Sequence, residues 1–99
     1  MLSHTVIFWT NPHHPNAAEE LLAGANQLLK NIPGVLSFHA GKMVPSHRPV
    51  VDQTYQVALS LTFADKPAEH EYQMHPQHME FAEQYVKLLV KRVVVYDFA

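Results

Sequence analysis

The sequence contains no cysteine and only three glycines. Without thiols the chain cannot form disulfides, use a cysteine nucleophile, hold zinc through thiolates or carry an iron–sulfur cluster. It also lacks a glycine-rich loop of the kind that binds phosphate groups. Any chemistry must therefore come from histidine, tyrosine or carboxylate side chains, or from a bound cofactor.

Charge and hydropathy argue against two classes of partner. Seven lysines and arginines stand against nine aspartates and glutamates, and no run of basic residues forms the footprint that a phosphate backbone needs. The longest apolar runs, VIFW and VVVY, are far too short to cross a bilayer, and the first residues lack the regions of a signal peptide. We therefore expect a cytoplasmic protein that binds neither nucleic acid nor membrane.

The amino-acid content is that of a small globular protein. Apolar residues make up 47% of the chain and charged residues 16%, which is ordinary for a folded domain. We expect a single domain over residues 1–99. Because a chain of 99 residues is near the lower limit for a self-sufficient core, we also expect a partner chain to contribute to stability.

Hydrophobic spacing and turn residues predict four strands and three helices in the order βαββαβ. Asn16 and Glu19 resemble a capping box at the start of the first helix, and Gly41 is a candidate for a β-bulge. The order predicts an α+β, ferredoxin-like fold with a four-stranded antiparallel sheet. The predicted strands cover residues 2–10, 35–44, 55–63 and 92–98, and the predicted helices cover residues 16–32, 65–74 and 76–90.

The first and last predicted strands are apolar on both faces. Val6 and Phe8 lie on one side of the first strand, and Ile7 and Trp9 lie on the other. Two helices can cover only one face of a four-stranded sheet. We therefore predict a homodimer in which the sheet of a second copy covers the other face, since two-fold homodimers are the commonest oligomers.

The segment YQMHPQHMEF, residues 72–81, contains most of the candidate chemistry. Proline disfavours the helical conformation in the residue before it and suits the first position of a helix. We therefore expect His75 to be extended and Pro76 to begin the long helix. At about 100° per residue, His78 then lies at the centre of the apolar face of that helix.

His78 has two possible roles. It is either a core histidine whose ring nitrogens are satisfied by neighbouring groups, or a base that projects into a cleft between the helices and the sheet. In the second case Tyr72, freed from the long helix by the break at Pro76, turns its hydroxyl toward the same cleft. A phenol donor beside an imidazole base would suit enolisation or addition at a carbonyl.

A metal site is the weaker interpretation of these histidines. His75 and His78 lie across a helix boundary and should point in different directions, and no third ligand stands at a recognisable spacing from them. The pair at positions 13 and 14 falls in a loop. We therefore predict no metal and no cofactor.

The residues resemble one known family, the stress-responsive dimeric α/β-barrel (Dabb) proteins. The resemblance runs over nearly the whole chain and is carried by SHTVIFW, LLKNIPGVLSFHAGK, YQVALSLTFAD, YQMHPQHMEF and VVVYDF. It implies a ferredoxin-like fold in which two chains pair sheet to sheet as a dimeric α/β barrel.

The branch of this family with known chemistry contains polyketide cyclases of the olivetolic acid cyclase type. These enzymes use no cofactor and close a linear polyketide by aldol condensation with a tyrosine and a histidine, which match Tyr72 and His78 here. The resemblance also implies a set of residues that line the ligand-binding cleft. To this set we add Leu22, and we add His75 because it would orient the turn between the helices. The residues implied to line the cleft are His4, Val6, Leu59, Val93 and Val95.

Two functions therefore remain open. The first is a cofactor-free lyase or cyclase, or by fold analogy an isomerase, that acts on an apolar carbonyl compound with His78 as base and Tyr72 as donor. The second is a non-catalytic, stress-related dimer that binds a small molecule. Leu21, Leu22 and Ala25 replace the bulky aromatic residues of the cyclases on the first helix, which argues against the same product.

Overall fold

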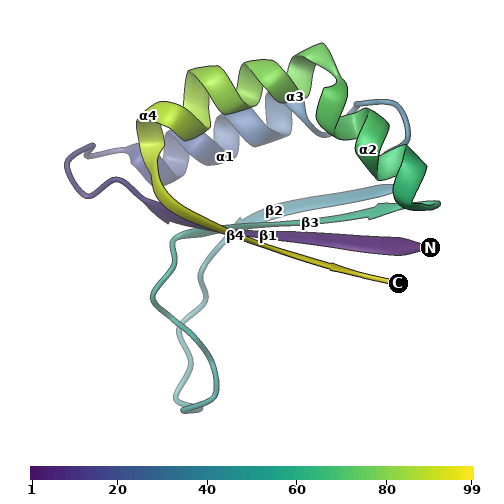
Figure 1. Cartoon of the computed structure of the whole chain (residues 1–99). Coiled ribbons are helices and arrows are strands. Elements are labelled where there is room, and N and C mark those ends of the chain that lie inside the picture. The colour runs from purple at the N-terminus through teal and green to yellow at the C-terminus, as the bar shows by residue number, and fades with distance from the viewer.

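The computed structural model describes all 99 residues and contains one four-stranded antiparallel sheet in the order β2-β3-β1-β4. The helices all lie against one face of this sheet (Figure 1). The predicted βαββαβ order and ferredoxin-like fold are confirmed. The strands are β1 (Leu2–Thr10), β2 (Ser37–Lys42), β3 (Val57–Phe63) and β4 (Val90–Phe98), and the helices are α1 (Ala17–Leu28), α2 (Lys66–Met74), α3 (Pro76–Phe81), the π-helical η1 (Ala82–Val86) and α4 (Lys87–Leu89).

The first helix is shorter than its apolar spacing predicted. It ends at Leu28, and the backbone N–H of Ile32 donates to the carbonyl of Leu29 in a tight turn. Both Leu29 and Ile32 are nevertheless buried in the core. Their apolar character therefore reflects packing of the turn that follows the helix, which periodicity alone cannot distinguish from a further helical turn.

The predicted capping box is wrong. The side chain of Asn16 makes no cap hydrogen bond, and Glu19 forms an ion pair with Lys42 of β2. A capping box requires the N3 carboxylate to reach back to the N–H of the capping residue. Here that carboxylate is directed toward the neighbouring strand.

The bulge predicted at Gly41 is also wrong. Gly41 pairs in regular register with Ala58, whereas the only irregularity of the sheet lies between Trp9 and Thr10 of β1. Beside it, the backbone N–H of Thr10 donates to the side chain of Gln56 at 2.8 Å, on the β3 side of the strand.

The break between α2 and α3 has the predicted form. His75 is extended, with φ −68° and ψ 140°, and Pro76 is the first residue of α3. The Nδ1 atom of His75 accepts a hydrogen bond of 3.1 Å from the backbone N–H of Gln77. His75 therefore caps α3 and fixes the angle between the two helices.

The core lies between the helices and the sheet. Strand β3 contributes every second residue to it, as the alternation in the sequence predicted, and Val6 and Phe8 extend it along β1. The largest fully buried apolar side chains from the two layers are Leu21, Leu29, Val57, Leu59, Leu61, Phe63, Tyr72 and Leu89.

Helix α1 packs very closely against η1 at one point. A Cβ atom added to Gly24 would lie 2.5 Å from Cδ1 of Tyr85, well inside van der Waals contact. Tyr85 in turn stacks on Phe81 with the ring centroids 5.9 Å apart. Only glycine at position 24 lets the two helices approach this closely.

We expect Gly24→Ala to destabilise the protein by about 1–3 kcal/mol, because the added methyl group overpacks the contact with Tyr85. Gly41→Ala is the matched control, since its Cβ would meet only His39 Nε2 at 3.4 Å. Urea unfolding of both variants measures the difference. Equal stability of the two variants would contradict the close packing of α1 on η1.

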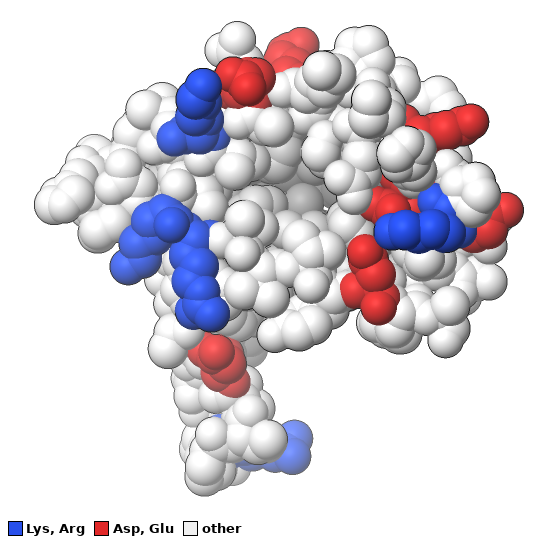
Figure 2. Space-filling model, viewed as in Figure 1, with Lys and Arg blue, Asp and Glu red and all other residues white.

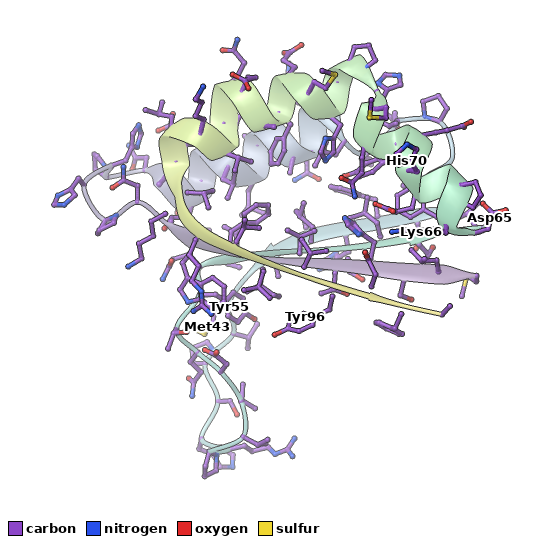
Figure 3. The ribbon with its side chains drawn as sticks, viewed as in Figure 1. Met43, Tyr55, Asp65, Lys66, His70 and Tyr96 are labelled. Carbon is purple, nitrogen blue, oxygen red and sulfur yellow. The ribbon has the colours of Figure 1, made fainter.

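The opposite face of the sheet is not covered by helices. Tyr96 and Phe98 of β4 are 60% and 62% exposed, and Tyr96 projects away from the helical layer (Figure 3). Trp9 is largely buried, because its indole N–H donates to Thr54 Oγ1 and the guanidinium of Arg92 lies 4.2 Å from its ring. The loop that joins β2 to β3 thus covers part of this face. None of the helices is long and apolar enough to span a membrane.

Candidate functional site

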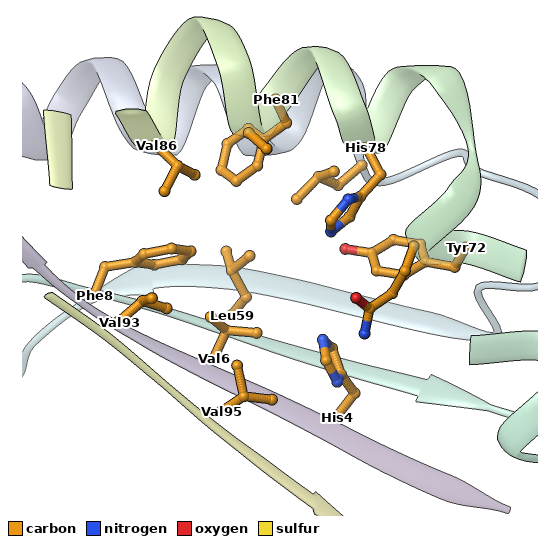
Figure 4. A pocket seen from close by; sticks show the side chains of 13 residues that line it. His4, Val6, Phe8, Leu59, Tyr72, His78, Phe81, Val86, Val93 and Val95 are labelled. Carbon is orange, nitrogen blue, oxygen red and sulfur yellow. The ribbon is translucent and has the colours of Figure 1, made fainter. Parts of the chain in front are cut away.

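A cavity of about 190 Å³ lies between the helical layer and the sheet. It is visible as a hollow in Figure 2, where charged side chains stand around the rim and none of them is seen inside. Most of its lining is apolar. The residues that line it are His4, Val6, Phe8, Leu29, Leu59, Tyr72, Gln73, His78, Phe81, Ala82, Val86, Val93 and Val95 (Figure 4).

The floor of the cavity follows from strand register. Alternate residues of a strand point to the same face, so β1 presents His4, Val6 and Phe8 to the helices. In the β1–β4 pairing, Val95 stands opposite Val6 and Val93 opposite Phe8. Strand β4 is an edge strand, so its two valines form a wall beside the solvent.

The roof of the cavity follows from the break at His75. Tyr72 lies near the end of α2 and His78 near the start of α3, and their rings meet edge to face with centroids 4.9 Å apart. The ring of His4 approaches Tyr72 from the sheet at 6.0 Å. Two imidazoles and one phenol therefore meet at one end of an otherwise apolar cavity.

Burial shifts the pKa values of two of these groups. It raises the pKa of Tyr72, and the nearby carboxylate of Glu69 raises it further, so Tyr72 is a protonated phenol at all physiological pH values. Burial lowers the pKa of His78, and His4 lowers it further, against an opposing effect of Glu69. Tyr72 can therefore donate a hydrogen bond while a neutral His78 can accept a proton.

A network of charged groups lies behind His4. Its Nδ1 atom lies 2.5 Å from Oδ1 of Asp97 and 3.9 Å from a carboxylate oxygen of Glu69. Lys66 donates to Glu69 at 2.8 Å and lies 3.7 Å from Asp97, and Gln73 donates to Glu69 as well. Figure 3 shows Lys66 directed from α2 toward the sheet.

Glu69 is a buried carboxylate with compensated charge. Only 1% of its surface is exposed. Burial raises its pKa, but hydrogen bonds from Lys66 and Gln73 outweigh that effect and hold the pKa below its usual value. The same pairing raises the pKa of Lys66. Glu69 is therefore ionised in the folded protein at neutral pH.

His4, Glu69 and Asp97 are also the residues best placed to hold a metal ion, since their ligand atoms lie within 4.8 Å of one another. Lys66 contacts both carboxylates and offsets part of their charge. The histidine-rich segment is not part of this group, because His75 caps α3 and His78 faces the aromatic rings.

The structure brings most of the predicted site residues together. Seven of them line the one cavity: His4, Val6, Leu59, Tyr72, His78, Val93 and Val95. Leu22 and His75 do not line it. Leu22 is half-buried at the edge of the core on α1, and His75 acts on the backbone of α3.

Several site residues were not among the predicted ones. The place of Phe8 in the cavity lining could have been predicted from the strand alternation that predicted Val6. The places of Ala82 and Val86 could have been predicted from helical spacing after His78. Periodicity in the sequence does not indicate a place at the site for Gln73, Glu69 or Asp97. A glutamate in a polar helix is usually solvated, and only the folded packing buries it.

The fold and the cavity together define a small α+β protein with an apolar pocket that is polar at one end. Residues 2–99 match the family model of the stress responsive A/B barrel domain (Dabb), and the chain belongs to this family. The resemblance seen in the sequence is thereby confirmed.

A curated relative agrees with this assignment, and two solved structures share the fold. The stress-response A/B barrel domain-containing protein HS1 of Arabidopsis thaliana is 36% identical over 82% of this chain and 72% of its own length. A dimeric ferredoxin-like protein of unknown function from Thermobifida fusca superposes with a TM-score of 0.80 at 19% identity, covering 99% of this chain and 89% of that one. Hydroxynitrile lyase from Passiflora edulis has the same fold, with a TM-score of 0.75 at 17% identity over 98% of this chain and 90% of its own.

Proposed function

We propose that the protein binds a small apolar carbonyl compound in the cavity between helices and sheet, with the carbonyl oxygen facing Tyr72. One observation carries this proposal. A buried phenol and two imidazoles meet at one end of an apolar cavity of about 190 Å³. Such a site excludes water from the apolar part of a ligand while polar groups orient its polar atom.

The same arrangement supports cofactor-free lyase or cyclase chemistry. One of the two imidazoles of the cavity, His78 or His4, would accept a proton from the carbon next to the carbonyl, and the electrons of the broken C–H bond would pass to the oxygen as an enolate. The hydroxyl of Tyr72 would stabilise that oxyanion in a low-dielectric site. The hydroxynitrile lyase fold is compatible with lyase activity on this scaffold, although the likeness extends to the fold alone.

A non-catalytic binding protein is the second candidate, and the packing of Tyr72 favours it. The side chain is 1% exposed and touches the rings of His4, Phe63 and His78. A tyrosine enclosed by three rings can serve the core as well as a ligand. In that case the cavity holds a small molecule in a stress response without converting it.

Tyr72→Phe tests the ligand pose. Cyclopentanone should bind the wild-type protein measurably in an NMR titration, and the variant should bind it about tenfold more weakly, because a hydrogen bond to the carbonyl is worth about 1–1.5 kcal/mol. Phe38→Leu is a control that leaves the cavity lining unchanged. Phe38 belongs to β2, where it pairs with Leu61 of β3, and it does not line the cavity. Equal affinity in wild type and Tyr72→Phe would contradict the proposed pose.

We further propose that a second copy of the chain covers the sheet face that carries Tyr96 and Phe98. The dimeric Thermobifida fusca protein of the same fold supports pairing. The exposed aromatic residues of β4 support this face as the interface, because Tyr96 projects away from the helical layer (Figure 3) and Phe98, two residues further along the strand, lies on the same face. A cytoplasmic location stays a prediction from the sequence.

A further inference from the structure

The two histidines of the cavity have different polar surroundings. His78 meets the edge of Tyr72 and has no carboxylate at hydrogen-bond distance, whereas His4 Nδ1 lies 2.5 Å from Oδ1 of Asp97. His4 is also almost fully buried, at 3% exposure. A buried imidazole with a short contact to a carboxylate has a fixed ring orientation, which an imidazole held only by packing lacks.

The contact with Asp97 determines which nitrogen of His4 carries the proton. An ionised carboxylate only accepts hydrogen bonds, so Nδ1 must be the donor. In the neutral ring Nε2 then has a free lone pair. Figure 4 shows a ring nitrogen of His4 directed into the cavity, on the side of Tyr72. A ligand bound against Tyr72 would therefore meet an unprotonated nitrogen.

We infer that His4 and Asp97 form a proton-transfer dyad in which His4 Nε2 accepts a proton from the ligand and Asp97 positions the ring. This inference rests on the proposed function, because it requires a carbonyl compound in the cavity. The C–H bond next to the carbonyl breaks, its electrons move to the oxygen that Tyr72 binds, and the proton moves to Nε2. Return of that proton to the ligand carbon or to water completes the step.

Three charged groups lie around His4. From β4 comes the carboxylate of Asp97, and from α2 come the carboxylate of Glu69 and the ammonium of Lys66. Two negative charges and one positive charge leave a net negative charge next to the ring. His78, from α3, and Tyr72, from α2, face the cavity as neutral groups.

Asp97 is a positioning residue, and its effect is measurable without any ligand. Long-range proton–nitrogen NMR correlations of the His4 ring should show the Nδ1–H tautomer in the wild-type protein at a pH where the ring is neutral. In Asp97→Asn the amide can donate to Nδ1, which moves the ring proton to Nε2. Glu83→Gln, a change at an exposed carboxylate on η1, should leave the tautomer unchanged.

The consequence for proton transfer is tested with cyclopentanone in deuterated water. Exchange of its α-protons should be faster with the wild-type protein than in buffer, and Asp97→Asn should lose about tenfold or more of that acceleration while binding cyclopentanone as before. The Glu83→Gln variant should exchange at the wild-type rate.

Three results would overturn the dyad. An Nε2–H tautomer in the wild-type protein removes its base. Full exchange activity in Asp97→Asn, together with loss of exchange in His78→Gln, assigns the proton transfer to His78 and leaves the proposed function standing. Failure of cyclopentanone to bind the wild-type protein overturns the proposed function and the catalytic role of His4 together.

Discussion

Replacing Tyr96 with aspartate is expected to convert the proposed dimer to a folded monomer. Tyr96 is 60% exposed in the single chain, so the substitution removes nothing from the core. In a two-fold interface it occurs twice, and each copy places a charge against an apolar sheet. Loss of one central aromatic residue costs an interface about 2 kcal/mol or more, so two copies should weaken association about a thousandfold.

Sedimentation equilibrium at micromolar concentration measures this effect. Leu88→Asp is a matched control, because Leu88 is similarly exposed, at 58%, but belongs to the helical layer. The control should remain a dimer with an unchanged thermal transition. A wild-type protein that sediments as a monomer would refute the interface, and so would a Tyr96→Asp variant that still sediments as a dimer.

Removal of the ammonium of Lys66 should destabilise the protein strongly at neutral pH. Lys66→Met leaves the carboxylate of Glu69 buried next to Asp97 without the cation that both contact. A buried carboxylate that loses its partner destabilises a protein. The hydrogen bond from Gln73 remains in the variant and moderates the loss at Glu69.

The loss should depend on pH in a defined direction. In the wild-type protein the pKa of Glu69 is held below its usual value, so its ionised form stabilises the fold above the unfolded pKa of about 4.3 and that stabilisation is lost as the pH falls. Without Lys66 burial dominates and raises the pKa of Glu69. Protonation of Glu69 then removes the unpaired buried charge from the variant. The difference in free energy of unfolding between the variant and the wild-type protein should therefore shrink as the pH falls below about 5.

Urea unfolding at neutral and acidic pH compares the variant with the wild-type protein. Lys87→Met is the control, because Lys87 pairs with the exposed Glu83 at the surface and such pairs contribute little. The idea fails if Lys66→Met loses little stability relative to the wild-type protein at neutral pH, or if its loss of stability grows on acidification. Either result would show that Lys66 does not stabilise the buried carboxylate of Glu69.

Much of the fold was predictable from the sequence because it depends on short-range patterns. The bounds of β1, the alternation in β3 and the helix start at Pro76 follow from strand periodicity and proline geometry. The turn after α1 was not, because Leu29 and Ile32 are buried whether or not the backbone is helical. The capping box failed because Glu19 pairs across space with Lys42.

The candidate site likewise contains residues that were predictable from local sequence patterns and residues that were not. His78 and Tyr72 were predictable because both belong to one segment whose helix break fixes their directions. The polar network behind His4 was not, because it joins residues 93 positions apart and depends on the β1–β4 register. The burial of Glu69 likewise depends on contact between α2 and β1, which forms only in the folded chain.

The π-helical segment Ala82–Val86 has a consequence for how this helix can vary in length. A π segment accommodates one residue more than an α-helix of the same rise, and the chain ahead of it and behind it turns by about 100° per residue. Deleting one residue there would restore an α-helix and leave Lys87–Leu89 in nearly the same phase relative to His78. Leu89 would then stay in the core while His78 kept its place. The segment thus takes up one additional residue between the half of the helix that carries the histidine and the half that leads into β4.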